Sequence, residues 1–423
     1  MTGSVAEAVP SDTRELVRLV YEESLKAREI VSQYAHHTPL DPSATFSRLT
    51  RARVYLKYEN LQKTGSFKIR GALYKIYSIK NEARGVVAAS AGNHAQGVAY
   101  AASVFGLPAV IVMPETASIA KVEATKGYGA EVVLYGRVFD DAEAKALEIA
   151  RERGYTFIPA FDDVKIIAGQ GTIAHELIQD LGDFDAVVVP VGGGGLISGI
   201  ASVLKTVKPG IKVYGVEPEN APKFTKSLEA GRPVRVEIRP TIADGLAVKR
   251  PGDITFRIVR ELVDDIVTVS EEEIAHAIYM LLERGKVLAE GAGAAALAAL
   301  LTGKLPVEGR KVVAIVSGGN IDLTALYRVL IRGLAASGRI VTLEGYVPDI
   351  PGTLADVAAV IARHRGNILE VVHDRSDLGA PAWHTRLRVT LEVPGPAEAE
   401  ALLNELAERG YRLRLKGQKP EAP

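Results

Sequence analysis

Residues 186–204 read AVVVPVGGGGLISGIASVL, and this stretch decides the fold. The valine-rich run at 186–190 is typical of a strand that is buried on both faces of a parallel sheet. Four glycines, Gly192 to Gly195, follow before a helix begins. Because glycine has no Cβ, the main-chain N–H groups of such a loop can approach an anion closely, and the helix dipole adds to the attraction. The stretch therefore predicts a strand–loop–helix unit that cradles a phosphate.

The alternatives for this loop are a flexible turn, a dinucleotide site and an ATP site. Glu217 ends the next predicted strand at about the distance expected of a ribose-binding acid. The glycines do not fit G-x-G-x-x-G, however, because Ile197 and Ser198 occupy the possible positions of the third glycine. The loop also lacks a Walker lysine. A single small phosphate is therefore the ligand that fits best.

The alternation of short apolar strands and amphipathic helices continues on both sides of this stretch. It predicts two parallel-sheet subdomains covered by helices on both faces, with right-handed crossovers. An initial helix, capped by Asp12, precedes them. The further strands of this part are expected at 54–56, 85–89, 109–113, 132–134, 212–216, 266–269 and 312–316.

The tail has a different order of elements, β-α-β-β-α-β, which is the ferredoxin-like order. Its elements are expected at 340–346, 353–365, 367–373, 384–393, 398–409 and 411–415. We place a domain boundary near 336–338. The sequence thus predicts a domain at 1–336, with a smaller subdomain at about 55–160 inserted in the larger one, and a second domain at 337–423.

Composition excludes several classes of function. The chain has 423 residues, of which 47% are hydrophobic, enough for two or three domains with large cores. Lys+Arg and Asp+Glu both number 51, so we expect neither a nucleic-acid partner nor a membrane partner. Cysteine is absent, which excludes disulfides, thiolate nucleophiles and Cys-ligated metals. The first ten residues do not resemble a signal peptide, and the apolar run at 291–301 is too short to span a bilayer, so we expect a soluble cytoplasmic protein.

Three further loops lie where a predicted strand is followed by a helix, the end of a parallel sheet at which ligands gather. Lys68 lies in the first turn of its helix, where the helix dipole favours the neutral amine that can form a Schiff base. Residues 90–97, SAGNHAQG, offer Asn93 at a helix start for a substrate carboxylate or a polar cofactor oxygen. After the strand at 312–316, Ser317 could donate to a ring nitrogen. Taken alone, each has an ordinary alternative: a solvated lysine, a capping asparagine and a capping serine.

Together, these motifs resemble the threonine dehydratases, also called threonine ammonia-lyases, of the fold-type II pyridoxal-phosphate (PLP) enzymes, whose fold is similar to that of tryptophan synthase β. The resemblance covers nearly the whole chain, and the motifs occur in the right order: SFKIRGA at 66–72, SAGNHAQG at 90–97, GGGGL at 192–196 and SGGN at 317–320. It implies PLP as the cofactor. It also implies β-elimination and deamination of L-threonine, and of L-serine, to a 2-oxo acid and ammonia.

The resemblance implies roles for individual residues as well. Lys68 matches the lysine that carries PLP, and Phe67 matches the aromatic residue beside the cofactor ring. Asn93 matches the residue that binds the ring hydroxyl, and Ser317 matches the serine near the pyridine nitrogen. The phosphate loop is matched by Gly192, Gly193, Gly194, Gly195 and Leu196. The loop that receives the substrate carboxylate is matched by Ser90, Ala91, Gly92 and His94.

Two departures from related patterns bear on the activity. Serine racemases, which are close relatives, carry a second serine at the position of Ala91; alanine cannot exchange a proton, so racemisation is the less favoured alternative. Relatives that bind a divalent cation use an acidic cluster after the strand that holds Glu217. Glu217 and Ala221 are compatible with that cluster, but Lys223 replaces an expected acid, and we assign no metal ligands.

Two histidine-containing pairs are near misses for metal sites. His175–Glu176 lacks the second histidine of H-E-x-x-H, because Gln179 stands there. We interpret this pair as ordinary helix surface, and His36–His37 as a polar pair before a turn.

The tail resembles an ACT domain, a regulatory module that binds amino acids. Residues 349–354, DIPGTL, match its first strand-to-helix loop, and 366–368, GNI, match the turn into its second strand. The resemblance implies an amino-acid effector, with Asp349, Gly352 and Asn367 as candidate contacts. Since one such unit is present, we expect an effector site between paired subunits of a homodimer or homotetramer. A catalytically inactive amino-acid sensor is the alternative of another class.

Overall fold

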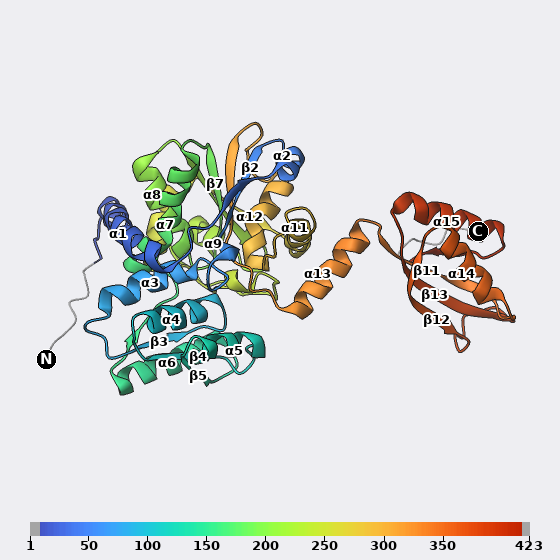
Figure 1. Ribbon diagram of the computed structural model, residues 1–423, viewed down its shortest axis with the longest axis horizontal. Coiled ribbons are helices and arrows are strands. Elements are labelled where there is room, and N and C mark those ends of the chain that lie inside the picture. Colours follow the sequence, from blue (N-terminus) through green and yellow to red (C-terminus); the bar gives the residue numbers. More distant parts are fainter. Residues whose placement is uncertain (1–8, 417–423) are drawn as a thin grey trace. The chain divides into compact units, whose positions relative to one another are not determined.

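The computed structural model describes residues 9–416, and the chain divides into two compact units, 1–323 and 324–423 (Figure 1). Helix α13 (Leu323–Ala336) begins at this division. The boundary expected near 336–338 lies at the other end of the same helix. The domain limits and the smaller subdomain, as given from the sequence, stay predictions. Within 9–416, no helix is both long and apolar enough to cross a membrane.

A six-stranded sheet forms the larger part of the first unit. Its strand order is β1-β2-β10-β7-β8-β9, and every pair except β1–β2 is parallel. The strands are β1 (Leu40–Pro42), β2 (Arg53–Tyr58), β7 (Ala186–Pro190), β8 (Lys212–Pro218), β9 (Asp265–Val269) and β10 (Lys311–Val316). The sequence did not predict the antiparallel edge strand β1. It is three residues long and ends in a proline, so it shows no periodicity and suits only an edge.

A second sheet, with four parallel strands in the order β5-β4-β3-β6, forms the smaller part of the first unit. Its strands are β3 (Val86–Ala89), β4 (Ala109–Met113), β5 (Glu131–Leu134) and β6 (Thr156–Phe157). Only the two-residue strand β6 was not predicted. The two sheets confirm the predicted fold class of paired parallel-sheet subdomains.

Helices cover both sheets, and α7 lies among three of them, α1, α3 and α8. Close approach there requires glycine: a Cβ on Gly199 would lie 2.3 Å from the carbonyl oxygen of Ile167. As predicted, Asp12 caps α1, accepting from the main-chain N–H of Arg14 at 2.8 Å. The helices of this unit are α1 (Thr13–Tyr34), α2 (Ala44–Thr50), α3 (Lys68–Ile79), α4 (Asn93–Val104), α5 (Ile119–Gly127), α6 (Phe139–Arg153), α7 (Val164–Leu181), α8 (Gly195–Val207), α9 (Lys223–Glu229), α10 (Asp253–Leu262), α11 (Glu271–Glu283) and α12 (Gly291–Leu301), with 3₁₀ turns η1 (Glu59–Leu61) and η2 (Asp244–Leu246).

The second unit contains an antiparallel sheet in the order β12-β13-β11-β14 and has its own apolar core. Two helices contribute to that core, so the sheet buries one face against them. The elements are β11 (Ile340–Pro348), α14 (Thr353–Arg363), β12 (Asn367–Asp374), β13 (His384–Glu392), α15 (Pro396–Glu408) and β14 (Leu413–Leu415). This is the predicted β-α-β-β-α-β order.

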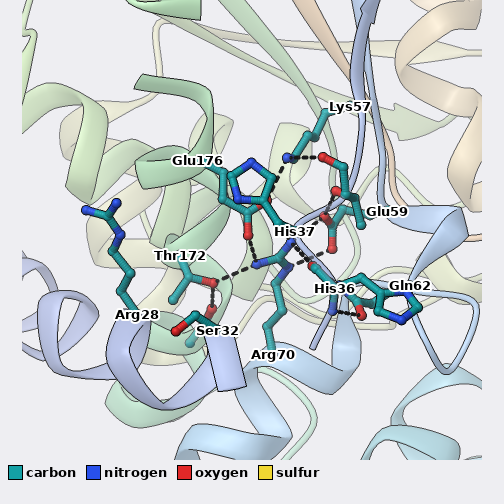
Figure 2. A network of polar contacts seen from close by, with 12 residues as sticks. Arg28, Ser32, His36, His37, Lys57, Glu59, Gln62, Arg70, Thr172 and Glu176 are labelled. Atoms are coloured by element: carbon teal, nitrogen blue, oxygen red, sulfur yellow. Dashed lines mark hydrogen bonds and ion pairs between the residues drawn. The ribbon is translucent and has the colours of Figure 1, made fainter. Parts of the chain in front are cut away.

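The interpretation of His175–Glu176 as helix surface was wrong. Both lie on α7, which is packed on several sides, so even its polar face is largely buried. Glu176 accepts from Nη1 of the fully buried Arg70 at 2.6 Å and lies 2.6 Å from Nζ of the buried Lys57 (Figure 2). Glu59 lies on the other side of the Arg70 guanidinium, with Nη2 donating to it at 2.7 Å. Burial lowers the pKa of His175 to about 4.

Candidate active site

A cavity of about 730 Å³ lies where the carboxyl ends of strands from both parallel sheets converge. Its size suits a small molecule. Segments that follow β3, β4, β6, β7 and β10 line it. The structure brings together in this cavity every residue predicted for the cofactor and the substrate: Phe67, Lys68, Ser90, Ala91, Gly92, Asn93, His94, Gly192, Gly193, Gly194, Gly195, Leu196 and Ser317.

Lys68 is the first residue of α3, and its side chain reaches into the cavity. Nζ donates to the carbonyl oxygen of Ala160 at 2.8 Å and lies 5.4 Å from the centroid of the Phe67 ring. Among residues 9–416 no carboxylate lies within ion-pair distance of it. Burial lowers the pKa of Lys68 to about 8. A large fraction of this amine is therefore neutral at mildly alkaline pH and can act as a nucleophile or a base.

The glycine loop has the shape of an anion cradle. Gly194 has φ +96°, and a Cβ there would lie 2.5 Å from Cζ of Phe224, while one on Gly193 would lie 2.2 Å from the ring of Phe161. Only glycine therefore fits these two positions. Within the described residues, the N–H groups of Gly193, Gly194 and Gly195 have no protein acceptor. Free N–H groups at the start of α8 are donors for a phosphate, so the loop fits the phosphate of PLP.

Asn93, the first residue of α4, lies in a chain of side-chain hydrogen bonds. Its Oδ1 accepts from Nδ2 of Asn320 at 2.8 Å, and its Nδ2 donates to Oε1 of Glu290 at 2.6 Å. The second N–H of the Asn93 amide is left for a cofactor oxygen. Ser317, which is buried, donates weakly to the Ala292 carbonyl at 3.3 Å.

Glu290 is a site residue that the sequence analysis missed. It lines the cavity and is only 4% exposed, and burial raises its pKa to about 7, helped by the negative charge of Asp244. The signal in the sequence is a lone carboxylate before the otherwise apolar run GAGAAALAAL of α12. Its place in the cavity lining, its hydrogen bond with Asn93 and its raised pKa make Glu290 a candidate functional residue.

The predicted substrate loop places a neutral imidazole beside the cavity. His94 is buried, and its Nε2 lies 3.0 Å from the carbonyl oxygen of Ile158, which can only accept, so Nε2 carries the proton. Burial, with the nearby charge of Lys68, lowers the pKa of His94 to about 3. His94 is therefore neutral at physiological pH and positions the loop rather than transferring a proton. Ser90 accepts from the N–H of Gly92 at 3.1 Å and thereby shapes the turn.

Ion pairs cross the cavity mouth between the smaller sheet's helices and the loop at 232–252. Lys121 of α5 lies 2.8 Å from Asp244, and Asp140 of α6 lies 3.0 Å from both Arg235 and Lys249. All five side chains line the cavity. Four of the five side chains are more than 40% exposed, so each pair adds little stability, and together they place charges of both signs along the cavity lining.

The three effector candidates lie in the second unit and do not meet within one chain. Asp349 accepts from Arg375, and Gly352, with φ +96°, precedes α14 in the same loop after β11. Asn367 begins β12 at the other end of the sheet, paired with Glu392, which pairs with the first residue of β11. A site that uses all three residues requires a second copy of the unit.

Comparisons with known proteins place the chain in one family of enzymes. The family model described as pyridoxal-phosphate dependent enzyme matches residues 31–318, and the ACT domain model matches 341–410. L-Threonine ammonia-lyase of Thermotoga maritima is 48% identical over 401 residues, which are 94% of this chain and 100% of that protein. The processed form of threonine deaminase isoform 2 from Solanum lycopersicum superposes with a TM-score of 0.72 at 38% identity, covering 76% of this chain and 94% of that one. Maize serine racemase has a TM-score of 0.70 at 36% identity, covering 75% and 98%.

Proposed function

Because the chain belongs to the pyridoxal-phosphate-dependent enzymes and carries an ACT domain, we propose that it is an L-threonine ammonia-lyase that also accepts L-serine. The observation that carries the proposal is one cavity in which a lysine with a lowered pKa faces a glycine cradle. L-Threonine is proposed as the substrate because the similar proteins are named as threonine ammonia-lyase and threonine deaminase. PLP, when bound, supplies an aldehyde that takes up amines and a ring that withdraws electrons from the substrate's α-carbon.

The protein's own residues hold the reactants and move the protons. The N–H groups of Gly193 to Gly195 would bind the phosphate of PLP, and the Asn93 amide and the Ser317 hydroxyl would position its ring. Lys68 Nζ would hold the cofactor and would serve as the base for the α-proton of the substrate, for which a pKa of about 8 is well suited. A serine hydroxyl is a very weak acid, so Ser317 beside the ring nitrogen would not keep that nitrogen protonated, which would favour elimination over transamination.

The overall reaction of threonine loses one water molecule and then takes up another. Threonine loses its α-proton and its β-hydroxyl as one water molecule, and the enamine that is released takes up water to give 2-oxobutanoate and ammonia. Serine gives pyruvate by the same route. Racemisation would need a second proton donor on the other face of the α-carbon, and Ala91 lacks one.

The proposal is tested by incubating the holoenzyme separately with L-threonine and L-serine. We expect 2-oxobutanoate and pyruvate to form in step with ammonia, measured by reduction of the oxo acid and by chiral chromatography of the remaining amino acid. If D-threonine or D-serine accumulates without oxo acid, the racemase alternative holds instead. If neither product forms while PLP and amino acids still bind, the sensor alternative holds.

We also propose that the tail regulates this activity by binding an amino acid between paired subunits of a homodimer or homotetramer. The separation of Asn367 from Asp349 within one chain supports an effector site shared by two copies. Isoleucine and valine are the first effectors to assay. A chain ending at Ser337 should keep turnover and lose the effector response, and persistent inhibition of this truncated enzyme would contradict the assignment. The cytoplasmic location stays a prediction.

A further inference from the structure

Lys223, at the start of α9, is a fully buried lysine whose Nζ is surrounded by oxygen atoms. Three of these are main-chain carbonyl oxygens, of Val191 at 2.5 Å, Leu246 at 3.2 Å and Ala221 at 3.4 Å. The fourth is Oε1 of the buried Glu217, at 3.0 Å. All four are hydrogen-bond acceptors, so the electrostatic potential at Nζ is negative.

Carbonyl oxygens and a carboxylate that converge on one point form the oxygen cage that proteins use for metal cations. An ammonium fits the same cage, because it carries a positive charge and three N–H donors and has no lone pair. A neutral amine would direct a lone pair at an acceptor. Burial lowers the pKa of Lys223, and the Glu217 carboxylate opposes that shift.

The cage joins the segments that shape the phosphate cradle. Val191 directly precedes the glycine loop, and Leu246 ends η2, on which the loop rests: a Cβ on Gly192 would lie 3.1 Å from the Gly245 carbonyl oxygen. Glu217 also accepts from the N–H of Phe224 at 2.9 Å, and the ring of Phe224 lies beneath Gly194. Carbonyl oxygens that point at one another repel, so the N–H groups of Lys223 between them stabilise this arrangement of segments.

We propose that the Lys223 ammonium is a built-in cation, which holds the base of the glycine loop and makes phosphate binding independent of any added metal or potassium ion. Lys223 Nζ occupies the point on which the four oxygens converge, so the cage has no room for a metal ion, and residues 9–416 contain no group of three or more His, Asp or Glu side chains placed to hold one. Lys223 is thus a positioning residue for the cradle. The proposal rests on the proposed function only in assigning the glycine loop to the phosphate of PLP.

The first test uses the unaltered protein. Holoenzyme is dialysed against EDTA and then assayed in potassium, sodium and tetramethylammonium chloride at equal ionic strength, with and without magnesium. We expect the affinity for PLP, measured by absorbance titration of the apoenzyme, and the melting temperature to be the same in all of these salts. A bound ion would raise the melting temperature as its concentration rises. Tighter PLP binding or a higher melting temperature in potassium or magnesium alone would overturn the proposal.

The second test empties the cage. Lys223→Ala should weaken PLP binding by at least about tenfold in tetramethylammonium chloride, and potassium or ammonium chloride should restore much of it, since these ions fit the vacated space and tetramethylammonium does not. Lys226→Ala is the matched control, because Lys226 lies on the same helix, exposed and paired with Glu229. Undiminished affinity in Lys223→Ala, or a loss that neither ion restores, would overturn the proposal.

If Lys223→Ala does not fold, Lys223→Gln keeps N–H donors without the charge, on a side chain that is one bond shorter and carries an amide oxygen. This variant should also bind PLP weakly, and full affinity in tetramethylammonium chloride would show that a neutral donor suffices and would overturn the proposal. PLP affinity and melting temperature are measured without turnover. These tests therefore decide the role of Lys223 even if the enzyme does not deaminate threonine.

Discussion

Lys68 and Arg70 lie two residues apart at the start of α3, and the protein surrounds these two basic side chains in opposite ways. Arg70 donates to Glu59 on one side and to Glu176 on the other, and these carboxylates raise its pKa above the usual range (Figure 2). Lys68 donates to a carbonyl oxygen and has no carboxylate beside it, so burial lowers its pKa to about 8. The difference shows that intrinsic basicity and partners act together: two carboxylates secure the charge of a strongly basic guanidinium, whereas burial without a carboxylate brings the pKa of an amine close to neutral pH.

The position of Lys68 also depends on the ion pairs of Arg70. The paired arginine joins α3 to η1, whose Glu59 lies 11 positions away in the chain, and to α7, whose Glu176 lies 106 positions away. This junction fixes the first turn of α3, and Lys68 projects from that turn into the cavity. A permanently charged anchor therefore holds in place the one amine that has to lose and regain its charge.

The largest effect is expected when the unpaired lysine is removed. Lys68→Ala should lower turnover of L-threonine by at least about 10³-fold, because both the covalent link to PLP and the base are lost. The melting temperature should change little, since the Arg70 network stays intact. Borohydride reduction followed by peptide mapping should place the pyridoxyl group on Lys68 in the unaltered enzyme. Residual turnover near the original rate, or a pyridoxyl group on another lysine, would contradict the assignment.

The next largest effect is expected when the paired cation is removed. Arg70→Met leaves Glu59 and Glu176 without their shared partner and should lower the free energy of unfolding by about 3–5 kcal/mol. Arg153→Gln is the matched control: Arg153 also forms two hydrogen bonds with one carboxylate, Glu131, but both side chains are largely exposed, so the expected cost is below about 1 kcal/mol. Calorimetry that follows the transition of the larger unit measures both. Equal, small costs for the two variants would show that burial adds nothing to the pairing.

Local patterns explain why most of the fold and much of the site could be predicted from the sequence. The glycine loop, the strand before it and the helix after it are contiguous in the chain, so their geometry follows from residues that are neighbours. Strands β1 and β6 were missed because two or three residues cannot show a period. Lys68, Asn93 and Ser317 were found because each follows a strand, and the carboxyl ends of parallel strands share one edge.

Long-range partners explain what the sequence could not predict. The Arg70–Glu176 pair joins residues 106 positions apart, and the Asn93–Glu290 hydrogen bond joins residues 197 positions apart. No periodicity links such positions, so Glu176 was taken for helix surface and Glu290 was passed over. Lys223 was noticed only as a departure from an acidic pattern, because the carbonyl oxygens around it belong to the main chain and leave no trace in residue identities.

The smallest effect is expected at Glu290. Like Lys68, Glu290 is a buried ionisable group without an oppositely charged group in contact, so it tests the same rule on an acid. Burial raises its pKa from 4.5 to about 7, so between these values the folded protein keeps a proton that the unfolded chain has lost. Folding therefore takes up a proton, and the free energy of unfolding falls as pH rises through this window. Below pH 4.5 Glu290 does not lower the free energy of unfolding, and above pH 7 it lowers this free energy by about 3 kcal/mol.

Glu290→Gln mimics the protonated acid at every pH, so the unfolding free energies of the variant and of the unaltered apoenzyme should diverge in favour of the variant as pH rises from 5 to 8. The variant should also lose any step near pH 7 in the pH profile of kcat/KM while keeping its rate at pH 6, because an amide can hold Asn93 as the neutral acid does. Glu308→Gln, at an exposed position paired with Arg51, is the control and should show neither change. Parallel unfolding profiles for Glu290→Gln and the unaltered protein would mean that Glu290 is ionised in the folded state, and its hydrogen bond to Asn93 would then be a charged one.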